Sequence, residues 1–184
     1  MTAARWDGGI LLLVGGARSG KSRLAVDLAV ASDRPVVYVA TAEAGDDEMA
    51  DRIDRHRAER PADWSTVEEP RAVAAALASI APDDFVIVDC LTLWVANLVV
   101  AGQSDASVLE QTRDLVATMA ARPGPTVVVT NEVGLGVHPE TDLGRRYRDV
   151  LGGVNRLAAA SARRTLLLVA GRAVRLDDPR ELLL

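Results

Sequence analysis

One short segment combines glycine, lysine and serine in the spacing that binds nucleotide phosphates. Residues 15–22 read Gly-Gly-Ala-Arg-Ser-Gly-Lys-Ser, directly after the apolar run Ile10–Val14 and at the start of a stretch with helical character. In this setting the backbone N–H groups of a glycine-rich loop and the N-terminus of a helix together hold a phosphate. Lys21 then brings positive charge to the β- and γ-phosphates, and the Ser22 hydroxyl coordinates Mg²⁺. Lys21 is also the only lysine among the 21 basic residues.

A second segment, Phe85–Asp89, places a carboxylate where a nucleotide-bound metal needs one. Its first four residues are apolar and predict a buried strand, which Asp89 closes. In proteins with this type of loop, a carboxylate at the end of a neighbouring strand holds Mg²⁺ directly or through water. We therefore expect Ser22 and Asp89 to form the metal site, with ordinary helix capping by Asp89 as the alternative. Asn131 and Glu132 follow another apolar run and are expected at the same sheet edge, where open α/β sheets bind ligands.

The sequence contains two histidines, and their settings differ. Met49, Ile53 and His56 share one face of the helix expected over Asp46–Ala58, so His56 follows the apolar side that faces inward. Taken alone, an inward histidine is more often a hydrogen-bonded packing residue than a catalyst. His138 lies in a segment flanked by glycine and proline, where a surface loop is the plainer interpretation.

Apolar runs of strand length alternate with longer amphipathic stretches along the chain. The runs lack apolar–polar alternation, which is typical of strands buried on both faces of a parallel sheet. We expect strands at Ile10–Val14, Val36–Ala40, Phe85–Asp89, Thr126–Thr130 and Thr165–Val169, with a short one at Trp64–Glu68. We expect helices at Lys21–Ala31, Asp46–Ala58, Arg71–Ile80, Ser107–Ala121 and Asp142–Ala162. The alternation predicts a doubly wound α/β sheet.

Length and composition are those of one globular domain. Of the 184 residues, 49% are apolar and 26% are charged, and no repeat or low-complexity segment marks a linker, so we assign residues 1–184 to a single domain. One cysteine, Cys90, excludes an internal disulfide and suits a reducing compartment. We find no secretory signal and no apolar stretch long enough to span a bilayer, and we expect a cytoplasmic protein. The net charge of -5 argues against nucleic acid as a partner.

Further segments make a pattern more specific than the phosphate loop alone. They are Ala40-Thr41-Ala42, Asp46-Asp47-Glu48-Met49, Arg52-Ile53, His56-Arg57, Arg60-Pro61, Trp64, Glu68 and Thr130-Asn131-Glu132-Val133-Gly134-Leu135-Gly136. Together with the phosphate loop, they resemble the bifunctional adenosylcobinamide kinase/adenosylcobinamide-phosphate guanylyltransferase family of cobalamin biosynthesis. The resemblance runs from Ile10 to Val174, nearly the whole chain. It implies a P-loop NTPase fold of the RecA-like type, with three layers around a mainly parallel central sheet.

The resemblance also implies roles for individual residues. In the family, the histidine that matches His56 becomes covalently guanylylated, so His56 and Lys21 are the expected catalytic residues. The expected nucleotide contacts are Gly15, Gly16, Ala17, Arg18, Ser19, Gly20, Lys21, Ser22, Ala40, Thr41, Ala42, Arg57, Ala58, Glu59, Arg60, Glu68 and Asp89. Mg²⁺ is the expected cofactor, held by Ser22 and Asp89.

Two successive group transfers follow from the resemblance. The first moves the γ-phosphoryl group of ATP or GTP to the aminopropanol hydroxyl of adenosylcobinamide. The second moves GMP from GTP to the resulting phosphate through a covalent His56–GMP intermediate. The alternative is a P-loop small-molecule kinase without guanylyltransferase activity, which would not need His56. Members of the family are oligomers, typically trimers, so we expect a homo-oligomer, for which an apolar helix over Leu91–Val100 could supply a contact surface.

Overall fold

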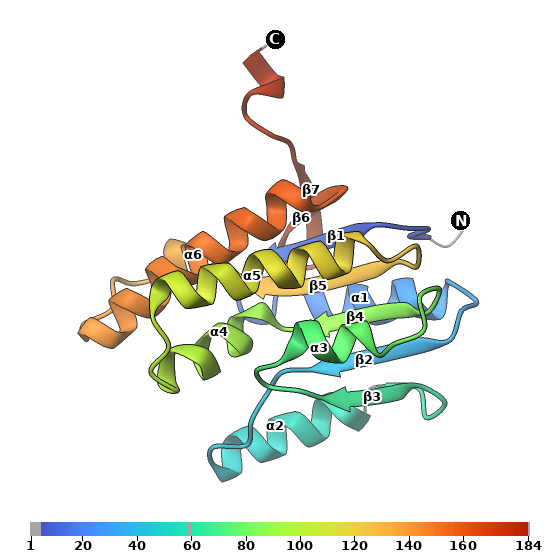
Figure 1. Ribbon diagram of the computed structural model, residues 1–184, viewed down its shortest axis with the longest axis horizontal. Helices are drawn as coiled ribbons and strands as arrows, with labels where there is room; N and C mark the ends of the chain where they lie inside the picture. Colours follow the sequence, from blue (N-terminus) through green and yellow to red (C-terminus); the bar gives the residue numbers. More distant parts are fainter. Residues whose placement is uncertain (1–4, 59, 184) are drawn as a thin grey trace.

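The computed structural model describes residues 5–58 and 60–183, and over these residues the chain forms a seven-stranded sheet (Figure 1). Its strands are β1 (Ile10–Gly15), β2 (Val36–Ala40), β3 (Ser65–Glu68), β4 (Phe85–Asp89), β5 (Thr126–Asn131), β6 (Arg164–Val169) and β7 (Arg172–Leu176). They lie in the order β3-β2-β4-β5-β1-β6-β7. All neighbours pair in parallel except β7, which runs antiparallel to β6. The expected mainly parallel sheet is confirmed.

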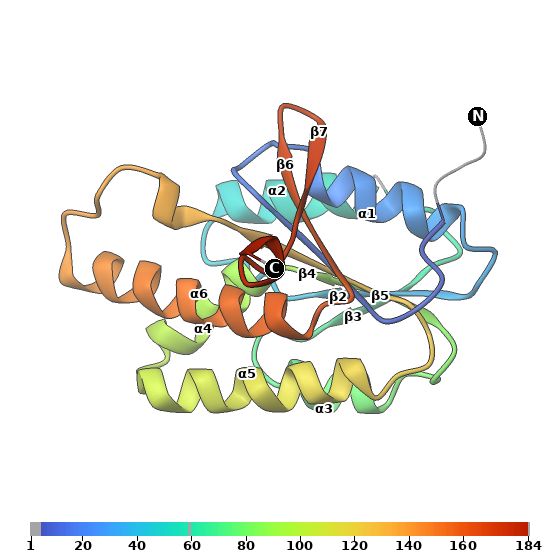
Figure 2. The same cartoon turned by 90° about the horizontal axis from the view of Figure 1, so that it is seen from above.

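Helices cover both faces of this sheet, as Figure 2 shows. One face carries α1 (Lys21–Val30) and α2 (Asp47–Ala58), and the other carries α3 (Val73–Ala78), α4 (Leu91–Val100), α5 (Asp105–Ala120) and α6 (Asp142–Ser161). Two short 3₁₀ turns, η1 (Val133–Leu135) and η2 (Glu181–Leu183), follow β5 and β7. The three layers expected from the alternating sequence pattern are therefore present.

The apolar runs of the central strands are explained by this double cover. Along β1, Leu11 and Leu13 pack into the core on the side of α1, while Ile10, Leu12 and Val14 pack into the core on the side of α4 and α6. Successive side chains of a strand point to opposite faces, so a strand covered on both faces is apolar at every position. The same geometry brings the carboxyl ends of the parallel strands to one edge of the sheet.

The structure departs from the sequence prediction at two elements. Strand β7 was not expected, because all of its residues are exposed and two arginines interrupt its apolar residues, so it contains no apolar run of strand length. Helix α4 is present, but most of its apolar residues, such as Trp94 and Leu98, are buried in the core of the same chain. The expectation that α4 offers a surface for oligomer contacts is therefore wrong, because its apolar face already packs inside the domain.

Among the helices within residues 5–58 and 60–183, none combines the length and the apolar character that crossing a bilayer requires.

Candidate active site

The phosphate loop connects β1 to α1, and two of its glycines are required by the backbone. Gly20, just before α1, has a φ of 101°, a left-handed conformation that glycine adopts without steric cost. At Gly15 the φ is 156°, and a Cβ would lie 2.3 Å from the carbonyl oxygen of Leu168 on β6. Any larger residue at Gly15 would force the loop away from β6.

Neighbouring strands fix the loop by backbone hydrogen bonds. The Gly171 N–H, in the turn between β6 and β7, donates to the carbonyl oxygen of Ser19 at 3.1 Å. On the other side, the Glu132 N–H, just after β5, donates to the carbonyl oxygen of Gly15 at 3.3 Å. The loop is thus held in shape by two segments that are far from it in sequence.

Lys21 lies inside the phosphate loop, with its side chain buried. Its Nζ donates to the carbonyl oxygens of Gly15 at 3.0 Å and Gly16 at 2.6 Å, and to Ser19 Oγ at 3.3 Å. The positive charge is therefore held within the curve of the loop, where it adds to the backbone N–H groups that favour a phosphate. The role of Lys21 towards the β- and γ-phosphates stays a prediction.

Asp89 ends β4, and Tyr38 of β2 holds one of its carboxylate oxygens. The Tyr38 hydroxyl donates to Asp89 Oδ2 at 2.7 Å. Burial, and then the adjacent Asp89 carboxylate, raise the pKa of Tyr38 far above its usual range. Tyr38 therefore stays protonated and remains a hydrogen-bond donor. Among the described residues, no group donates to the second oxygen, Oδ1.

The predicted metal ligands Ser22 and Asp89 are both close to Tyr38. Ser22 and Tyr38 line one small cavity, and Tyr38 bonds directly to Asp89. A hydroxyl and a carboxylate are hard oxygen donors, which Mg²⁺ prefers, and Mg²⁺ usually completes its coordination with waters and substrate phosphates. The residues present therefore fit the ion, and Asp89 Oδ1 is the oxygen available to it.

His56 faces the phosphate-binding helix. The last turn of α2 brings His56 to a cavity of about 20 Å³, shared with Ser22, Arg23 and Val26 of α1, with Tyr38 and with Arg60. His56 is half-buried, so the inward placement expected from helical spacing is confirmed. The cavity joins the histidine to the first turn of the helix that carries Lys21.

Arg60 forms the wall of this cavity beside His56. Its guanidinium lies 3.6 Å from the centre of the Tyr38 ring, a distance at which cation and ring attract. Its Nε is buried and has no hydrogen-bond partner among the described residues. A buried donor without a partner beside a phosphate site is suited to an anionic ligand.

The remaining expected nucleotide contacts lie at the carboxyl ends of β2 and β3. Ala40 is in register with Glu68 on one side and with Asp89 on the other. Thr41 is buried, and its hydroxyl donates to the Cys90 carbonyl at 2.7 Å, so this hydroxyl serves the connection between β2 and β4. Ala42, which follows it, is partly exposed.

The last residues of α2 differ in what they offer a ligand. Arg57 is exposed and forms an ion pair with Glu68, which joins the end of α2 to the end of β3. Ala58 is exposed, and Glu59 lies outside the described residues. Arg57 and Glu68 are therefore brought together at the rim, while His56 and Arg60 lie in the cavity.

Asn131 and Glu132 lie at the expected edge, and sequence reasoning missed the residue that holds them. Asn155 of α6 accepts from the Thr130 hydroxyl at 2.7 Å and donates to the Asn131 carbonyl at 3.0 Å. Its only signal in the sequence is a polar side chain on the buried face of a helix. Tyr38 was missed for a similar reason, because a tyrosine in an apolar strand first suggests packing. His138 lies in an exposed loop, as expected.

Comparison with known proteins identifies the family of this chain. The family model described as cobinamide kinase / cobinamide phosphate guanyltransferase matches residues 11–176. The bifunctional adenosylcobalamin biosynthesis protein CobP of Pseudomonas aeruginosa is 48% identical over 87% of this chain and 92% of its own length. The bifunctional adenosylcobalamin biosynthesis protein CobU of Salmonella typhimurium is 41% identical over 91% of this chain and 99% of its own length.

A solved structure supports the fold alone. The flagellar accessory protein FlaH of Methanocaldococcus jannaschii superposes with a TM-score of 0.52 at 16% identity, over 93% of this chain and 79% of FlaH. The family match covers most of the chain, and it includes the phosphate loop, the segment around His56 and the segment after β5. The chain belongs to the cobinamide kinase / cobinamide phosphate guanyltransferase family.

Proposed function

We propose that this chain catalyses both reactions of its family: it phosphorylates adenosylcobinamide with ATP or GTP, and then transfers GMP from GTP to the resulting phosphate. The observation that carries the proposal is the position of His56 in one cavity with Ser22 of the phosphate-binding helix. Transfer of a γ-phosphoryl group depends on positioning by the loop and the metal, and it does not require a histidine. A histidine at this place favours the bifunctional enzyme over the plain kinase.

In the first reaction, the hydroxyl oxygen of adenosylcobinamide attacks the γ-phosphorus of the nucleotide. The bond from that phosphorus to the β–γ bridging oxygen breaks, the hydroxyl proton is released, and a nucleoside diphosphate leaves. Lys21 and the backbone N–H groups of residues 15–22 hold the phosphates and stabilise the charge that develops on the leaving group.

In the second reaction, a ring nitrogen of His56 attacks the α-phosphorus of GTP, and pyrophosphate leaves as the α–β bridging bond breaks. Neutral imidazole is an effective nucleophile near neutral pH. A phosphate oxygen of adenosylcobinamide phosphate then attacks the same phosphorus, the phosphorus–nitrogen bond breaks, and adenosylcobinamide-GDP forms. The Arg60 guanidinium, in the same cavity, balances the negative charge of the α-phosphate.

Mg²⁺ enters this proposal through Ser22 and Asp89. The ion, when bound, neutralises charge on the phosphates and orients them. Tyr38 keeps the Asp89 carboxylate oriented by its hydrogen bond at 2.7 Å.

The decisive experiment is labelling with GTP that carries a radioactive α-phosphate, in the presence of Mg²⁺ and without acceptor. The wild-type protein should retain label after denaturation, and His56→Ala should retain none while keeping most of its kinase activity. His138→Ala is the matched control, because it removes the other histidine from an exposed loop. The label should be lost in mild acid and persist in base, as a phosphorus–nitrogen bond requires.

Two outcomes would contradict the mechanism. If His56→Ala loses both activities while its circular dichroism spectrum stays that of the folded protein, His56 serves binding or packing rather than nucleophilic attack. If the label on the wild-type protein resists acid, the nucleophile is a hydroxyl.

We also propose that the chain works as a homo-oligomer, as its family resemblance implies. Sedimentation equilibrium should give the mass of a trimer, and the mass of a monomer at micromolar concentration would overturn this assembly.

A further inference from the structure

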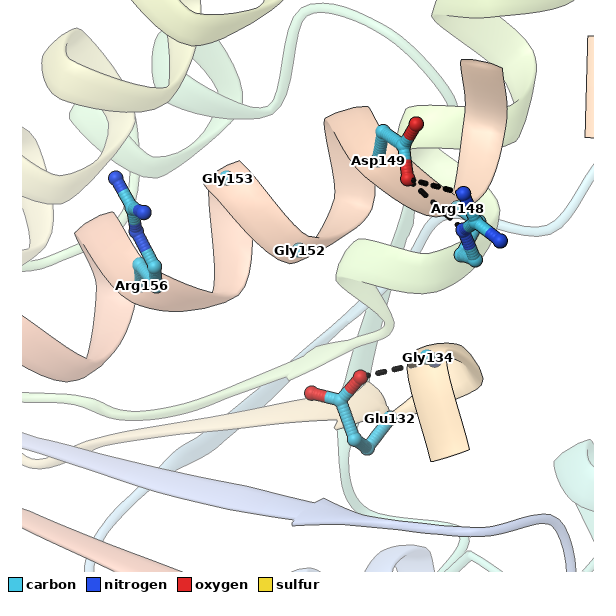
Figure 3. A pocket seen from close by; sticks show the side chains of 7 residues that line it. All are labelled: Glu132, Gly134, Arg148, Asp149, Gly152, Gly153 and Arg156. Carbon is cyan, nitrogen blue, oxygen red and sulfur yellow. Dashed lines mark hydrogen bonds and ion pairs between the residues drawn. The ribbon is translucent and has the colours of Figure 1, made fainter. Parts of the chain in front are cut away.

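A groove of about 670 Å³ runs between α6 and the segment that follows β5 (Figure 3). One wall is formed by Glu132 and Gly134, and the other by five residues of α6, from Arg148 to Arg156. The groove contains none of the residues assigned above to the nucleotide or the metal. It is open to solvent, so a ligand can enter it sideways and leave bulky groups outside.

The groove begins next to the phosphate loop. Its wall residue Glu132 donates a backbone hydrogen bond to the carbonyl oxygen of Gly15, the first residue of the loop. The preceding residue, Asn131, is in register with Gly15 across the β1–β5 pair. In both views, the segment after β5 lies at the same edge of the sheet as the connection from β1 to α1 (Figures 1 and 2). A group bound in the groove would therefore have its end near the terminal phosphate of a nucleotide.

The groove is lined by two arginines, Arg148 and Arg156, and by two carboxylates, Asp149 and Glu132. Arg148 forms an ion pair with Asp149 at 2.8 Å. Glu132 Oε1 accepts from the Gly134 N–H at 3.0 Å, which holds that carboxylate against its own wall. Arg156 forms no ion pair with any described residue. Figure 3 shows Arg148 and Arg156 at opposite ends of the α6 wall, with the two glycines between them.

The glycines make the floor of the groove accessible. Arg148, Gly152 and Arg156 are spaced four residues apart, so they share one face of α6, and about 12 Å of helix separates the two arginines. Apart from the backbone of its own helix, a Cβ on Gly152 would meet no atom of the described residues within 4 Å. Glycine weakens a helix interior, and no contact among residues 5–58 and 60–183 requires it at Gly152. A ligand that approaches the helix backbone there would require it.

We propose that this groove binds the aminopropanol arm of the acceptor, first as an alcohol and then as a phosphate monoester, with Arg156 as the contact for the phosphate. The inference rests on the proposed function, because it takes adenosylcobinamide as the acceptor. The arm lies over Gly152 with its reacting end towards Gly15, and the large ring stays at the open mouth of the groove. Arg156 is a binding residue in this arrangement and does not contact the nucleotide.

Equilibrium dialysis with adenosylcobinamide and with adenosylcobinamide phosphate tests the groove without turnover, because both compounds are coloured. Arg156→Ala should weaken binding of the phosphate by about tenfold or more, as expected for a charge-assisted hydrogen bond, and should weaken binding of the alcohol much less. Gly152→Leu should weaken both by at least about tenfold by filling the floor. If Gly152→Leu does not fold, Gly152→Ala should show the same direction with a smaller effect. Arg113→Ala, an exposed arginine on α5, is the matched control and should change neither.

The half-reaction with GTP separates this inference from the proposed function. Formation of labelled protein from GTP needs no acceptor, so the groove variants should label at close to the wild-type rate. If the wild-type protein takes no label, guanylyl transfer is refuted. The dialysis measurement still tests whether the groove binds the acceptor. The proposal that the groove binds the acceptor is refuted if Arg156→Ala and Gly152→Leu bind both acceptors as the wild type does. It is equally refuted if Gly152→Leu changes only the sedimentation mass, because the groove would then be a contact between copies of the chain.

Discussion

Tyr38 and Asp89 show how a residue outside the recognised motifs can control the site. The Tyr38 hydroxyl holds Asp89 Oδ2, and the same ring supports the Arg60 guanidinium beside His56. One side chain thus contacts both the carboxylate that we propose for the metal and the cation that we propose for the nucleotide. In other proteins, residues that hydrogen-bond to the side chains holding a metal strongly influence the affinity for that metal.

We therefore predict that Tyr38→Phe raises the Mg²⁺ concentration needed for half-maximal GTP binding by about tenfold. The fold should survive, because the ring that packs under Arg60 is retained. A Mg²⁺ titration with a fluorescent GTP analogue measures the effect. Tyr147→Phe is the control, since its hydroxyl bonds to the Thr92 carbonyl on the other face of the sheet. Equal Mg²⁺ dependence in Tyr38→Phe and the wild type would show that the Asp89 carboxylate needs no such support.

Cys90 gives a prediction about pH. Burial, and then the neighbouring Asp89 carboxylate, raise the pKa of Cys90 to about 12. In the unfolded chain a cysteine ionises near pH 8.5. The folded state therefore keeps the neutral thiol, and its contribution to stability is complete below about pH 8.5 and is lost as the pH rises towards 12.

The measurable consequence is a thiol that does not react while the protein is folded. Only the thiolate attacks a disulfide reagent, so Cys90 should react with Ellman's reagent at pH 8 orders of magnitude more slowly than free cysteine. In urea the reaction should become complete within the mixing time. Rapid reaction in the folded protein would mean that the end of β4 opens readily.

At the scale of elements, helix α6 contains two consecutive glycines with different surroundings. A Cβ on Gly152 would meet open space, whereas a Cβ on Gly153 would lie 3.0 Å from Leu109 Cδ2 of α5. Gly152 therefore lowers the stability of the helix without being required by the fold. Gly153 allows α6 to approach α5.

We predict that Gly152→Ala raises the free energy of unfolding by about 0.5–1 kcal/mol, the difference in helix propensity. Gly153→Ala should gain less or nothing, because the Leu109 side chain must move. Urea unfolding followed by circular dichroism measures both. A loss of stability in Gly152→Ala would mean that the groove floor is already occupied by part of the protein.

Elements whose sequence carries a local signal could be predicted, and those that depend on distant contacts could not. The apolar runs of β1, β2, β4 and β5 could be predicted because burial on both faces makes nearly every position apolar, and the run of β6 could be predicted although that strand is only partly buried. Strand β7 has no comparable apolar run, because it is supported only by its pairing with β6. The order of the strands, with β5 between β1 and β4, is set by packing and had no signal in any one segment.

In the site too, features with a local sequence signal could be predicted, and features that depend on distant contacts could not. The loop at residues 15–22 is local in sequence, so its type and spacing sufficed to predict it. The contact of Tyr38 with Asp89 joins residues 51 positions apart, and that of Glu132 with Gly15 joins the segment after β5 to the end of β1. Contacts of that kind depend on strand order and register, which the sequence pattern leaves open.

At the scale of the whole molecule, two apolar cores share one sheet. Trp6 lies in the core on the side of α1, and Trp94 lies in the core on the side of α4 and α6. Because each central strand sends alternate side chains into both cores, neither core can be lost while the other persists. The chain should therefore unfold as one cooperative unit, as expected for a single domain.

Two variants test this cooperativity, one that keeps only Trp6 and one that keeps only Trp94, with the other tryptophans changed to phenylalanine. In each variant, the urea midpoint from tryptophan fluorescence should equal the midpoint from circular dichroism. Midpoints that differ between the two signals would show that one face of the sheet melts before the other.

The burial of the chain's single lysine also gives a way to observe the phosphate loop opening. A protease that cuts only after lysine has one target bond in this chain, between Lys21 and Ser22, where the loop enters α1. Lys21 is only 6% exposed, so cleavage requires the loop and the first turn of α1 to come apart. When reclosing is faster than cutting, the rate of digestion reports the population of that opened state. Bound nucleotide slows digestion in proportion to the occupied fraction, so the appearance of two fragments on a gel measures nucleotide affinity without any catalytic turnover.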